Sequence, residues 1–290
     1  SSRSSTRSAT ALSIPFSPTH ISTSIMYIFV DNMMSGPLST LMNLKSPYPL
    51  MHVSVPLIGC AVYVLTLIAF WPKQGSKAKP SSAFFKTFIF FHNIILMVYS
   101  GIVFASTCPE FAKAAANSSS WEMFVTTYYK GEHWNAFGPW AWTFYISKFY
   151  EFVDTWIILC KGGRPSKLQV FHHIGAVLTM WCAVISRAPT TWVFVIFNAC
   201  VHTIMYAYYA MTAIGFRPKF KILITFLQIF QFCLGLFCSY GYYAVPGALT
   251  TYQTMAVSFT QTYAAIVLYL FVEFAFSTYY CKPVQKKKTV

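Results

Sequence analysis

The chain of 290 residues is 56% hydrophobic and 19% aromatic, and only 10% of its residues are charged. This composition lies outside the usual range of soluble globular domains and predicts a polytopic membrane protein. The formal net charge of +14 does not indicate a nucleic-acid partner, because the basic residues fall between apolar runs and not on one face of a folded domain.

Residues 1–45 are rich in serine and threonine and contain no continuous apolar run before Pro15. A segment of this composition buries too little apolar surface to fold, so we expect a disordered lumenal tail and assign it no function. A transit peptide is the alternative interpretation of the same composition.

Seven runs of mainly apolar residues follow, each long enough to cross the ~30 Å hydrocarbon core of a bilayer as a helix. The prediction is an all-α fold in which residues 46–281 form a domain of seven transmembrane helices. The third, fourth and fifth runs are the least apolar, because they carry polar motifs. The runs lie at 53–71, 84–106, 138–160, 168–186, 190–213, 220–243 and 255–279.

Basic residues gather in alternate connections between these runs. Fourteen lie in the odd-numbered connections and the tail, and six lie on the opposite side. The positive-inside rule therefore predicts a lumenal N-terminus and a cytosolic basic tail at 282–290. Lys287 and Lys288 stand fourth and third from the last residue, which resembles a dilysine signal for the endoplasmic reticulum. An ordinary flanking charge cluster is the alternative.

The third run carries four polar residues on one helical face. Lys148, Glu151, Asp154 and Thr155 are spaced i, i+3, i+6 and i+7, which places them on one arc. A lysine can pair with a glutamate three residues on and so lower the cost of burying both charges. The pattern indicates either a polar clamp at the cytosolic end of the helix or a direct role in chemistry.

Histidines mark the fourth and fifth runs. His172 and His173 are adjacent, and His202 lies on the next run with Asn198 one turn before it and Tyr206 one turn after it. Neutral imidazole can act as a nucleophile or general base, and a neighbouring amide or tyrosine can stabilise a developing oxyanion. Three histidines on neighbouring intramembrane helices favour chemistry over satisfied core residues.

The sixth run carries a polar residue at every third position. Thr225, Gln228 and Gln231 would form a stripe along one face of a helix. The pattern predicts either that this stripe faces the same cavity as the histidines, or that it makes hydrogen bonds between helices.

Together these motifs resemble those of the ELO family of very-long-chain fatty acid elongases. The segment KFYEFVDT at 148–155 resembles the family pattern KxxExxDT, and NACVHTIMYAYY at 198–209 resembles NxxxHxxMYxYY. TFLQIFQ at 225–231 resembles TxxQxxQ, and His92 with Asn93 extends the likeness to the second run. The family histidine box HxxHH reads QVFHH at 169–173, so Gln169 replaces its first histidine. Similar boxes occur in elongases of polyunsaturated acyl chains, including the microalgal Δ9 type.

The resemblance implies a 3-ketoacyl-CoA synthase of the endoplasmic reticulum membrane. Such an acyltransferase condenses an acyl-CoA with malonyl-CoA to give a 3-ketoacyl-CoA, CO2 and free CoA, and it needs no cofactor. The family fold implies a narrow acyl-chain tunnel enclosed by helices two to seven. Beyond the two CoA substrates and the lipid bilayer, the implied partners are the ketoreductase, dehydratase and enoyl reductase of the elongation cycle and a second copy of the chain.

The resemblance also assigns roles to residues, with no metal ligand among them. Two orders of events stay open: acyl transfer to His172 before malonyl-CoA reacts, or a ternary complex in which the histidines act only as bases. The expected catalytic residues are His172, His173, His202, Asn198 and Tyr206. The expected substrate- and CoA-binding residues are Lys148, Glu151, Asp154, Gln169, Tyr209, Gln228, Gln231, His92 and Asn93.

Two other classes of protein compete with this interpretation. A di-iron desaturase or hydroxylase also carries histidine boxes, but it needs a larger ligand set, and His20, His52 and His133 lie outside the expected site. The eight cysteines show no CxxC spacing and do not predict a zinc site. A seven-helix receptor or transporter would explain the topology but not the adjacent histidine pair.

Overall fold

The computed structural model describes residues 41–73, 82–128 and 132–280, and all of them belong to one compact unit that spans 37–290. The expected basic tail lies outside the described residues, as does all but the end of the expected N-terminal tail. Within the described ranges every regular element is helical. The predicted all-α fold class is therefore confirmed.

Six long helices match six of the seven predicted runs. Five of them, α4 and α8 to α11, are long and apolar enough to cross a membrane, whereas α3 is a shorter apolar helix. These numbers are compatible with seven spans. The bounds are Ser54–Phe70 for α3, Ala83–Ala116 for α4, Lys167–Ile185 for α8, Thr191–Ala213 for α9, Lys221–Tyr240 for α10 and Thr251–Ala275 for α11. A 3₁₀ turn at Gly241–Ala244 extends α10, and a π turn at Phe276–Tyr280 extends α11.

The third predicted span is wrong as a single helix over 138–160. The structure has α6 at Glu132–Tyr150 and α7 at Phe152–Cys160, with Glu151 between them. The amide of Asp154 donates to the carbonyl of Glu151 at 3.1 Å, an i to i+3 bond that tightens the chain at this point. Because the break is a single residue, the side chains of Lys148 and Glu151 still lie on the same side of this segment.

Helix α4 extends beyond the second predicted span. The apolar run stops near 106, and α4 continues for ten more residues to Ala116, because a helix needs apolar residues only where it crosses a membrane. The short helix α5, Trp121–Tyr128, lies in the connection that the sequence left without an element.

The start of α8 follows from local sequence. The side-chain oxygen of Ser166 accepts a hydrogen bond from the main-chain N–H of Gln169 at 3.1 Å. This bond satisfies one of the free donors of the first turn. Pro165 precedes this cap, where a proline costs the helix no hydrogen bond. The cap places Gln169, His172 and His173 in the first two turns of α8.

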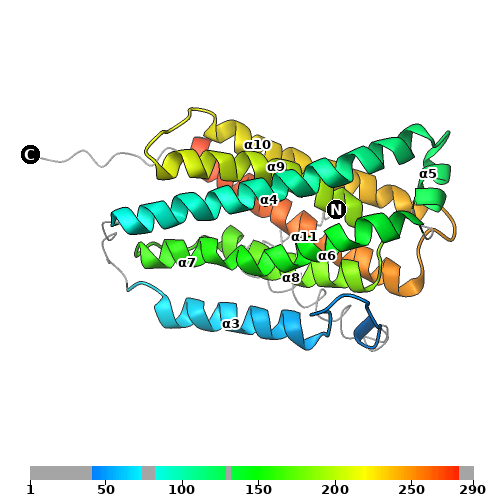
Figure 1. Cartoon of the computed structure of the whole chain (residues 1–290), viewed down its shortest axis with the longest axis horizontal. Coiled ribbons are helices and arrows are strands. Elements are labelled where there is room, and N and C mark those ends of the chain that lie inside the picture. Colours follow the sequence, from blue (N-terminus) through cyan, green and yellow to red (C-terminus); the bar gives the residue numbers. More distant parts are fainter. Residues whose placement is uncertain (1–40, 74–81, 129–131, 281–290) are drawn as a thin grey trace, which may run out of the picture. The chain divides into compact units, whose positions relative to one another are not determined.

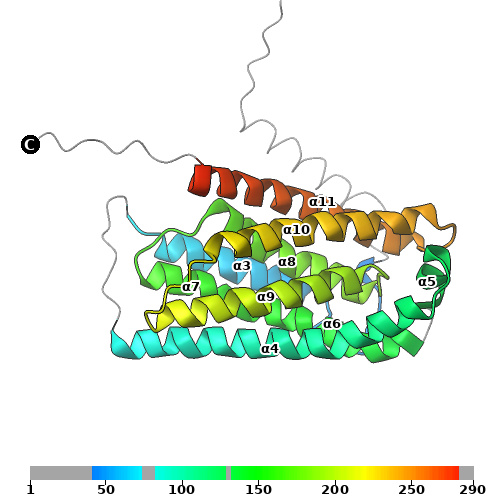
Figure 2. The ribbon, with the colours of Figure 1, turned by 90° about the horizontal axis from the view of Figure 1, so that it is seen from above.

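The helices of the described residues pack as a ring. The most extensive pair is α4 with α9, and α9 continues through α10 and α11 to α8 (Figure 2). Contacts of α8 with α6, and of α6 with α4 and α9, complete the ring. Helix α3 packs on α8 and α7 at its edge (Figure 1). The interior of this ring holds the polar motifs.

One end of the ring gathers the basic connections. The C-terminal ends of α3, α7 and α9 lie there beside the N-terminal ends of α4, α8 and α10 (Figure 1). The connections therefore alternate between the two ends, as predicted. Basic residues of the described ranges at this end are Lys73, Lys86, Lys161, Arg164, Lys167, Arg217, Lys219 and Lys221.

Candidate active site

A cavity of about 530 Å³ lies inside the ring, with walls from α4, α7, α8, α9, α10 and α11. Its size is within the range of small-molecule sites. Lys161 and Lys221, from the basic end, also line it. Most of the predicted site residues meet here: Asn93, Glu151, Asp154, Gln169, His172, His173, Asn198, His202, Tyr206, Tyr209, Gln228 and Gln231.

A smaller cavity of about 50 Å³ adjoins the first and is mainly apolar. Lys148 lines it together with aromatic and aliphatic side chains, among them Phe144 and Phe197. Both cavities are lined by His172, Asn198, Gln231 and Phe232. These four residues therefore mark the boundary between the wider cavity, which holds the polar motifs, and the narrower apolar one.

A buried ion pair stands beside this boundary. Lys148 and Glu151 are only 3% and 2% exposed, and the lysine Nζ donates to Glu151 Oε1 at 2.6 Å. The same Nζ donates to Asn198 Oδ1 at 3.0 Å and lies 3.9 Å from the centre of the Phe144 ring. The predicted Lys–Glu pair is confirmed. Because its oxygen accepts from Lys148, Asn198 keeps its amide hydrogens for another acceptor.

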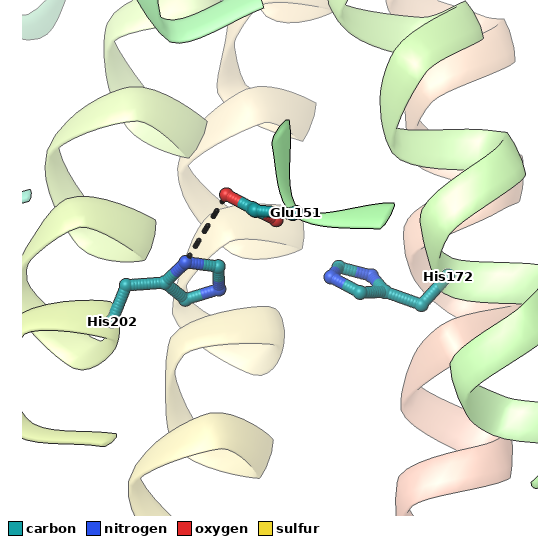
Figure 3. Close-up of side chains that lie close together, drawn as sticks. All are labelled: Glu151, His172 and His202. Carbon is teal, nitrogen blue, oxygen red and sulfur yellow. Dashed lines mark ion pairs between the residues drawn. The ribbon is translucent and has the colours of Figure 1, made fainter. Parts of the chain in front are cut away.

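Glu151 also joins the two histidine motifs. Figure 3 shows the rings of His172, from α8, and His202, from α9, facing one another with the Glu151 carboxylate beside the gap. The centroids of the two histidine rings are 6.5 Å apart. His202 Nδ1 lies 3.5 Å from Glu151 Oε1, which is within ion-pair distance but too long for a good hydrogen bond.

The same three side chains could converge on a metal ion, since one ligand atom from each lies within 4.8 Å of the others. The Lys148 ammonium already occupies Glu151 Oε1 at 2.6 Å, so a divalent cation bound there would meet a positive charge at close range. Three ligands are also fewer than a di-iron centre requires. We assign no step to a metal.

A second polar network surrounds Asp154. His92 Nε2 lies 2.9 Å from Asp154 Oδ1, and the Tyr206 hydroxyl donates to Oδ2 at 2.7 Å. Asn93 Nδ2 donates to the carbonyl oxygen of Ile89, one turn earlier in α4, at 2.6 Å. The acid of the α7 motif is thus held by residues of the α4 and α9 motifs.

Gln169 occupies the place of the missing histidine and makes one specific contact. Its Nε2 donates to Thr155 Oγ1 at 3.1 Å, and Thr155 also bonds the hydroxyl of Tyr63, from α3, at 2.9 Å. Sequence reasoning did not single out Tyr63, because nothing in the first run distinguishes it from a packing tyrosine.

The predicted polar stripe of α10 faces the larger cavity. Thr225, Gln228 and Gln231 all line it. Gln228 Nε2 lies 3.3 Å from the sulfur of Met205, and the buried Oε1 of Gln231 has no hydrogen-bond partner among the described residues. An unpartnered buried amide at the wall of a cavity is suited to a polar group of a ligand.

Tyr263 of α11 is a second residue that the sequence analysis missed. Its hydroxyl lies 2.7 Å from His172 Nδ1 and 2.9 Å from the carbonyl oxygen of His172. The last run shows no motif around this residue, and one tyrosine among 19 gives no signal of its own. Only the packing of α11 on α8 brings it to the histidine box.

Helices of membrane-spanning length that enclose a buried, ionisable cavity define a multi-pass membrane protein with an internal site. Residues 48–288 match the family model described as the GNS1/SUR4 (ELO) family. The chain belongs to this family.

Curated relatives carry elongase names. The chain is 38% identical over 112 residues to fatty acid elongase 2 of Trypanosoma cruzi, covering 37% of this chain and 40% of the relative. It is 29% identical over 171 residues to very long chain fatty acid elongase 6 of Drosophila melanogaster, covering 58% and 53%. For fatty acid elongase sre1 of Dictyostelium discoideum the values are 30% over 193 residues, 64% and 69%. The matches to the first two thus span about half or less of those proteins.

Proposed function

We propose that the protein is a fatty acid elongase that condenses a long-chain acyl-CoA with malonyl-CoA to a 3-ketoacyl-CoA, CO2 and free CoA. Family membership and the names of the relatives support this activity. The observation that carries it is the position of His172, which lines both the wider cavity that holds the polar motifs and the narrower apolar one. A thioester held at this boundary would have its acyl chain on one side and its CoA on the other.

The two sides suit the two parts of the substrate. Apolar side chains of the smaller cavity would take the alkyl chain, with ~0.8 kcal/mol gained for each buried CH₂ group. Lys161 and Lys221, at the basic end of the larger cavity, would bind CoA phosphates. The expectation that Lys148 holds the CoA end stays a prediction. Its contacts with Glu151 and Asn198 give it the further role of orienting these two side chains.

In the first half-reaction, His172 attacks the acyl thioester carbonyl through an imidazole nitrogen. The new C–N bond forms as the C–S bond breaks, and CoA leaves as a thiolate that takes up a proton. The Nδ2–H groups of Asn198 are not used in the contact with Lys148. Asn198 would therefore donate one of them to the oxyanion of the tetrahedral intermediate.

In the second half-reaction, malonyl-CoA loses CO2 as its C–C bond breaks, and the electron pair of that bond forms an enolate. The enolate carbon attacks the acyl-imidazole carbonyl, the C–N bond breaks and His172 is regenerated. His202 Nδ1 lies beside the Glu151 carboxylate, which would favour the proton on Nδ1 and leave Nε2 to accept a proton as a general base. A ternary complex with histidines acting only as bases is the alternative order.

The finer assignments belong to the same proposal. Gln169 in the histidine box supports a polyunsaturated acyl chain as substrate. Family membership supports an endoplasmic reticulum location, and the alternating basic connections support an orientation with the N-terminus lumenal and the basic ends of the helices cytosolic. In that membrane the ketoreductase, dehydratase and enoyl reductase that process a 3-ketoacyl-CoA would act next, and a second copy of the chain is a candidate neighbour.

The test is purified protein with labelled malonyl-CoA and a panel of saturated and polyunsaturated acyl-CoAs. We expect release of CO2 and free CoA in equal amounts together with a 3-ketoacyl-CoA, and the fastest turnover with a polyunsaturated chain. Turnover that depends on stoichiometric iron and leaves malonyl-CoA intact would instead identify a desaturase or hydroxylase. Ligand binding without any turnover would identify a receptor or transporter.

A further inference from the structure

The Tyr263 hydroxyl meets His172 twice. It lies 2.7 Å from the ring nitrogen Nδ1 and 2.9 Å from the main-chain carbonyl oxygen of the same residue. We propose that this double contact makes Tyr263 a positioning residue that fixes His172 in one tautomer, with the proton on Nδ1 and a lone pair on Nε2. The kinetic consequence rests on the proposed function, whereas the tautomer does not.

The tautomer follows from counting hydrogens. A tyrosine hydroxyl has a single hydrogen, and a carbonyl oxygen can only accept. If the hydroxyl donated to Nδ1, two oxygen atoms would face each other at 2.9 Å with no hydrogen between them. Donation to the carbonyl avoids this repulsion, and the hydroxyl oxygen then accepts from Nδ1–H. Both contacts are satisfied only when Nδ1 carries the proton.

The neighbours of Tyr263 hold its ring in this place. The residue is 6% exposed, and its ring stacks on Phe171 with centroids 5.8 Å apart. The ring also lies against Gly175, one turn after Phe171 in α8, where an added Cβ atom would overlap two ring carbons. The missing side chain lets α11 approach α8 closely enough for the hydroxyl to reach His172. A buried ring packed against both of these α8 residues has little freedom to move its hydroxyl away.

The other ring nitrogen points toward the proposed chemistry. Figure 3 shows the ring nitrogen of His172 farthest from the backbone directed toward Glu151 and His202. With Nδ1–H committed to Tyr263, this Nε2 holds the lone pair that attacks a thioester or accepts a proton. The opposite tautomer would present an N–H group to the cavity and could do neither.

Tyr263→Phe removes the hydroxyl and keeps the ring that packs on Phe171 and Gly175. The matched control is Tyr269→Phe on the same helix, where the side chain is 63% exposed. Both variants are compared with wild type for kcat and KM with one acyl-CoA and malonyl-CoA. The tautomer is read from 15N NMR of histidine-labelled protein, with the His172 signals assigned as those absent from His172→Asn.

We expect kcat of Tyr263→Phe to fall at least about tenfold, which corresponds to ~1.4 kcal/mol in the barrier, with KM changed less than twofold. The His172 signals should move from the Nδ1–H pattern of wild type to a mixture of tautomers. Tyr269→Phe should match wild type in both measurements.

Three outcomes would overturn the proposal. They are an Nε2–H tautomer in the wild-type protein, a His172 spectrum that Tyr263→Phe leaves unchanged, and unchanged kcat despite a changed spectrum. Failure of the proposed function looks different: wild type would then show no condensation, while the NMR result would still decide the tautomer.

Discussion

Tyr206 donates its hydroxyl to Asp154 at 2.7 Å, so the tyrosine of the α9 motif is tied to the acid of the α7 motif. Tyr206 is 1% exposed, whereas the Asp154 side chain is 21% exposed. The contact explains why a tyrosine and an aspartate that lie 52 residues apart belong to one site.

Tyr206→Phe should therefore impair both stability and turnover. The change leaves Asp154 Oδ2 without its donor. A hydrogen bond to a charged group contributes about 1.5–3 kcal/mol, and we expect the lower end because the Asp154 side chain is 21% exposed. We expect a lower thermal midpoint in detergent and at least about a tenfold loss of kcat/KM. The control is Tyr240→Phe, because that side chain is 72% exposed. Equal midpoints and rates for Tyr206→Phe and wild type would mean that the contact contributes neither to stability nor to turnover.

His172→Ala and His202→Ala should each abolish condensation while the protein stays folded in the membrane. Each change removes a nucleophile or base and opens no large apolar void. Wild type incubated with acyl-CoA alone should give an acyl adduct by intact mass spectrometry, and His172→Ala should give none. His52→Ala is the control, since this exposed histidine lies outside both cavities and its ring bonds the Ser54 hydroxyl. If CoA is never released before malonyl-CoA is added, the ternary order is the correct one.

Lys148→Met should destabilise the protein more than the double change Lys148→Met with Glu151→Gln. The single change strands a carboxylate that is 2% exposed, and breaking one side of a buried pair costs about 3–5 kcal/mol. The double change removes that charge as well. The midpoints of wild type, both single variants and the double variant form a cycle that isolates the pair. Additive losses would show that the two residues do not interact, contrary to the 2.6 Å contact.

The Lys–Glu pair also shows how far sequence reasoning can reach in this molecule. Spacing along one helix predicted the contact of Lys148 with Glu151, because a local periodicity sets it. Apolar length predicted the helices, and the cost of intramembrane polarity picked out the histidines. The break at Glu151 was not predictable, since one tight turn leaves no mark in hydropathy. Neither was the contact of Tyr263 with His172, which depends on how α11 packs against α8.

Gly175→Ala should reduce turnover through Tyr263. A Cβ atom at this position would overlap the Tyr263 ring, so the ring and its hydroxyl must shift away from His172. We expect kcat to fall at least as far as in Tyr263→Phe. Gly101→Ala is the matched control, because its new methyl group would meet Thr203 Cγ2 at 3.7 Å, an ordinary contact. A Gly175→Ala variant with wild-type kcat would show that α8 and α11 can separate without effect on the site.

Gln169→His should keep substantial activity and change substrate preference. Glutamine cannot act as a general base near neutral pH, so a chain that works with Gln169 uses this position for orientation or for the shape of the cavity. Gln169 Nε2 donates to Thr155 at 3.1 Å, and a histidine ring N–H can make the same kind of bond. The larger ring would alter the shape of the cavity wall. Differences in fit of this size change the discrimination between two substrates by about 1–3 kcal/mol.

The measurement is the ratio of kcat/KM values for a saturated and a polyunsaturated acyl-CoA of equal length. Gln169→His should shift this ratio by about 10-fold or more, in line with that energy, while its total turnover stays within the same order as wild type. Gln169→Leu serves as the comparison, because it fills similar space but cannot donate to Thr155, and we expect it to lose more activity than the histidine variant. Loss of turnover with every acyl-CoA in a folded Gln169→His protein would instead place Gln169 in the chemistry itself, beside His172.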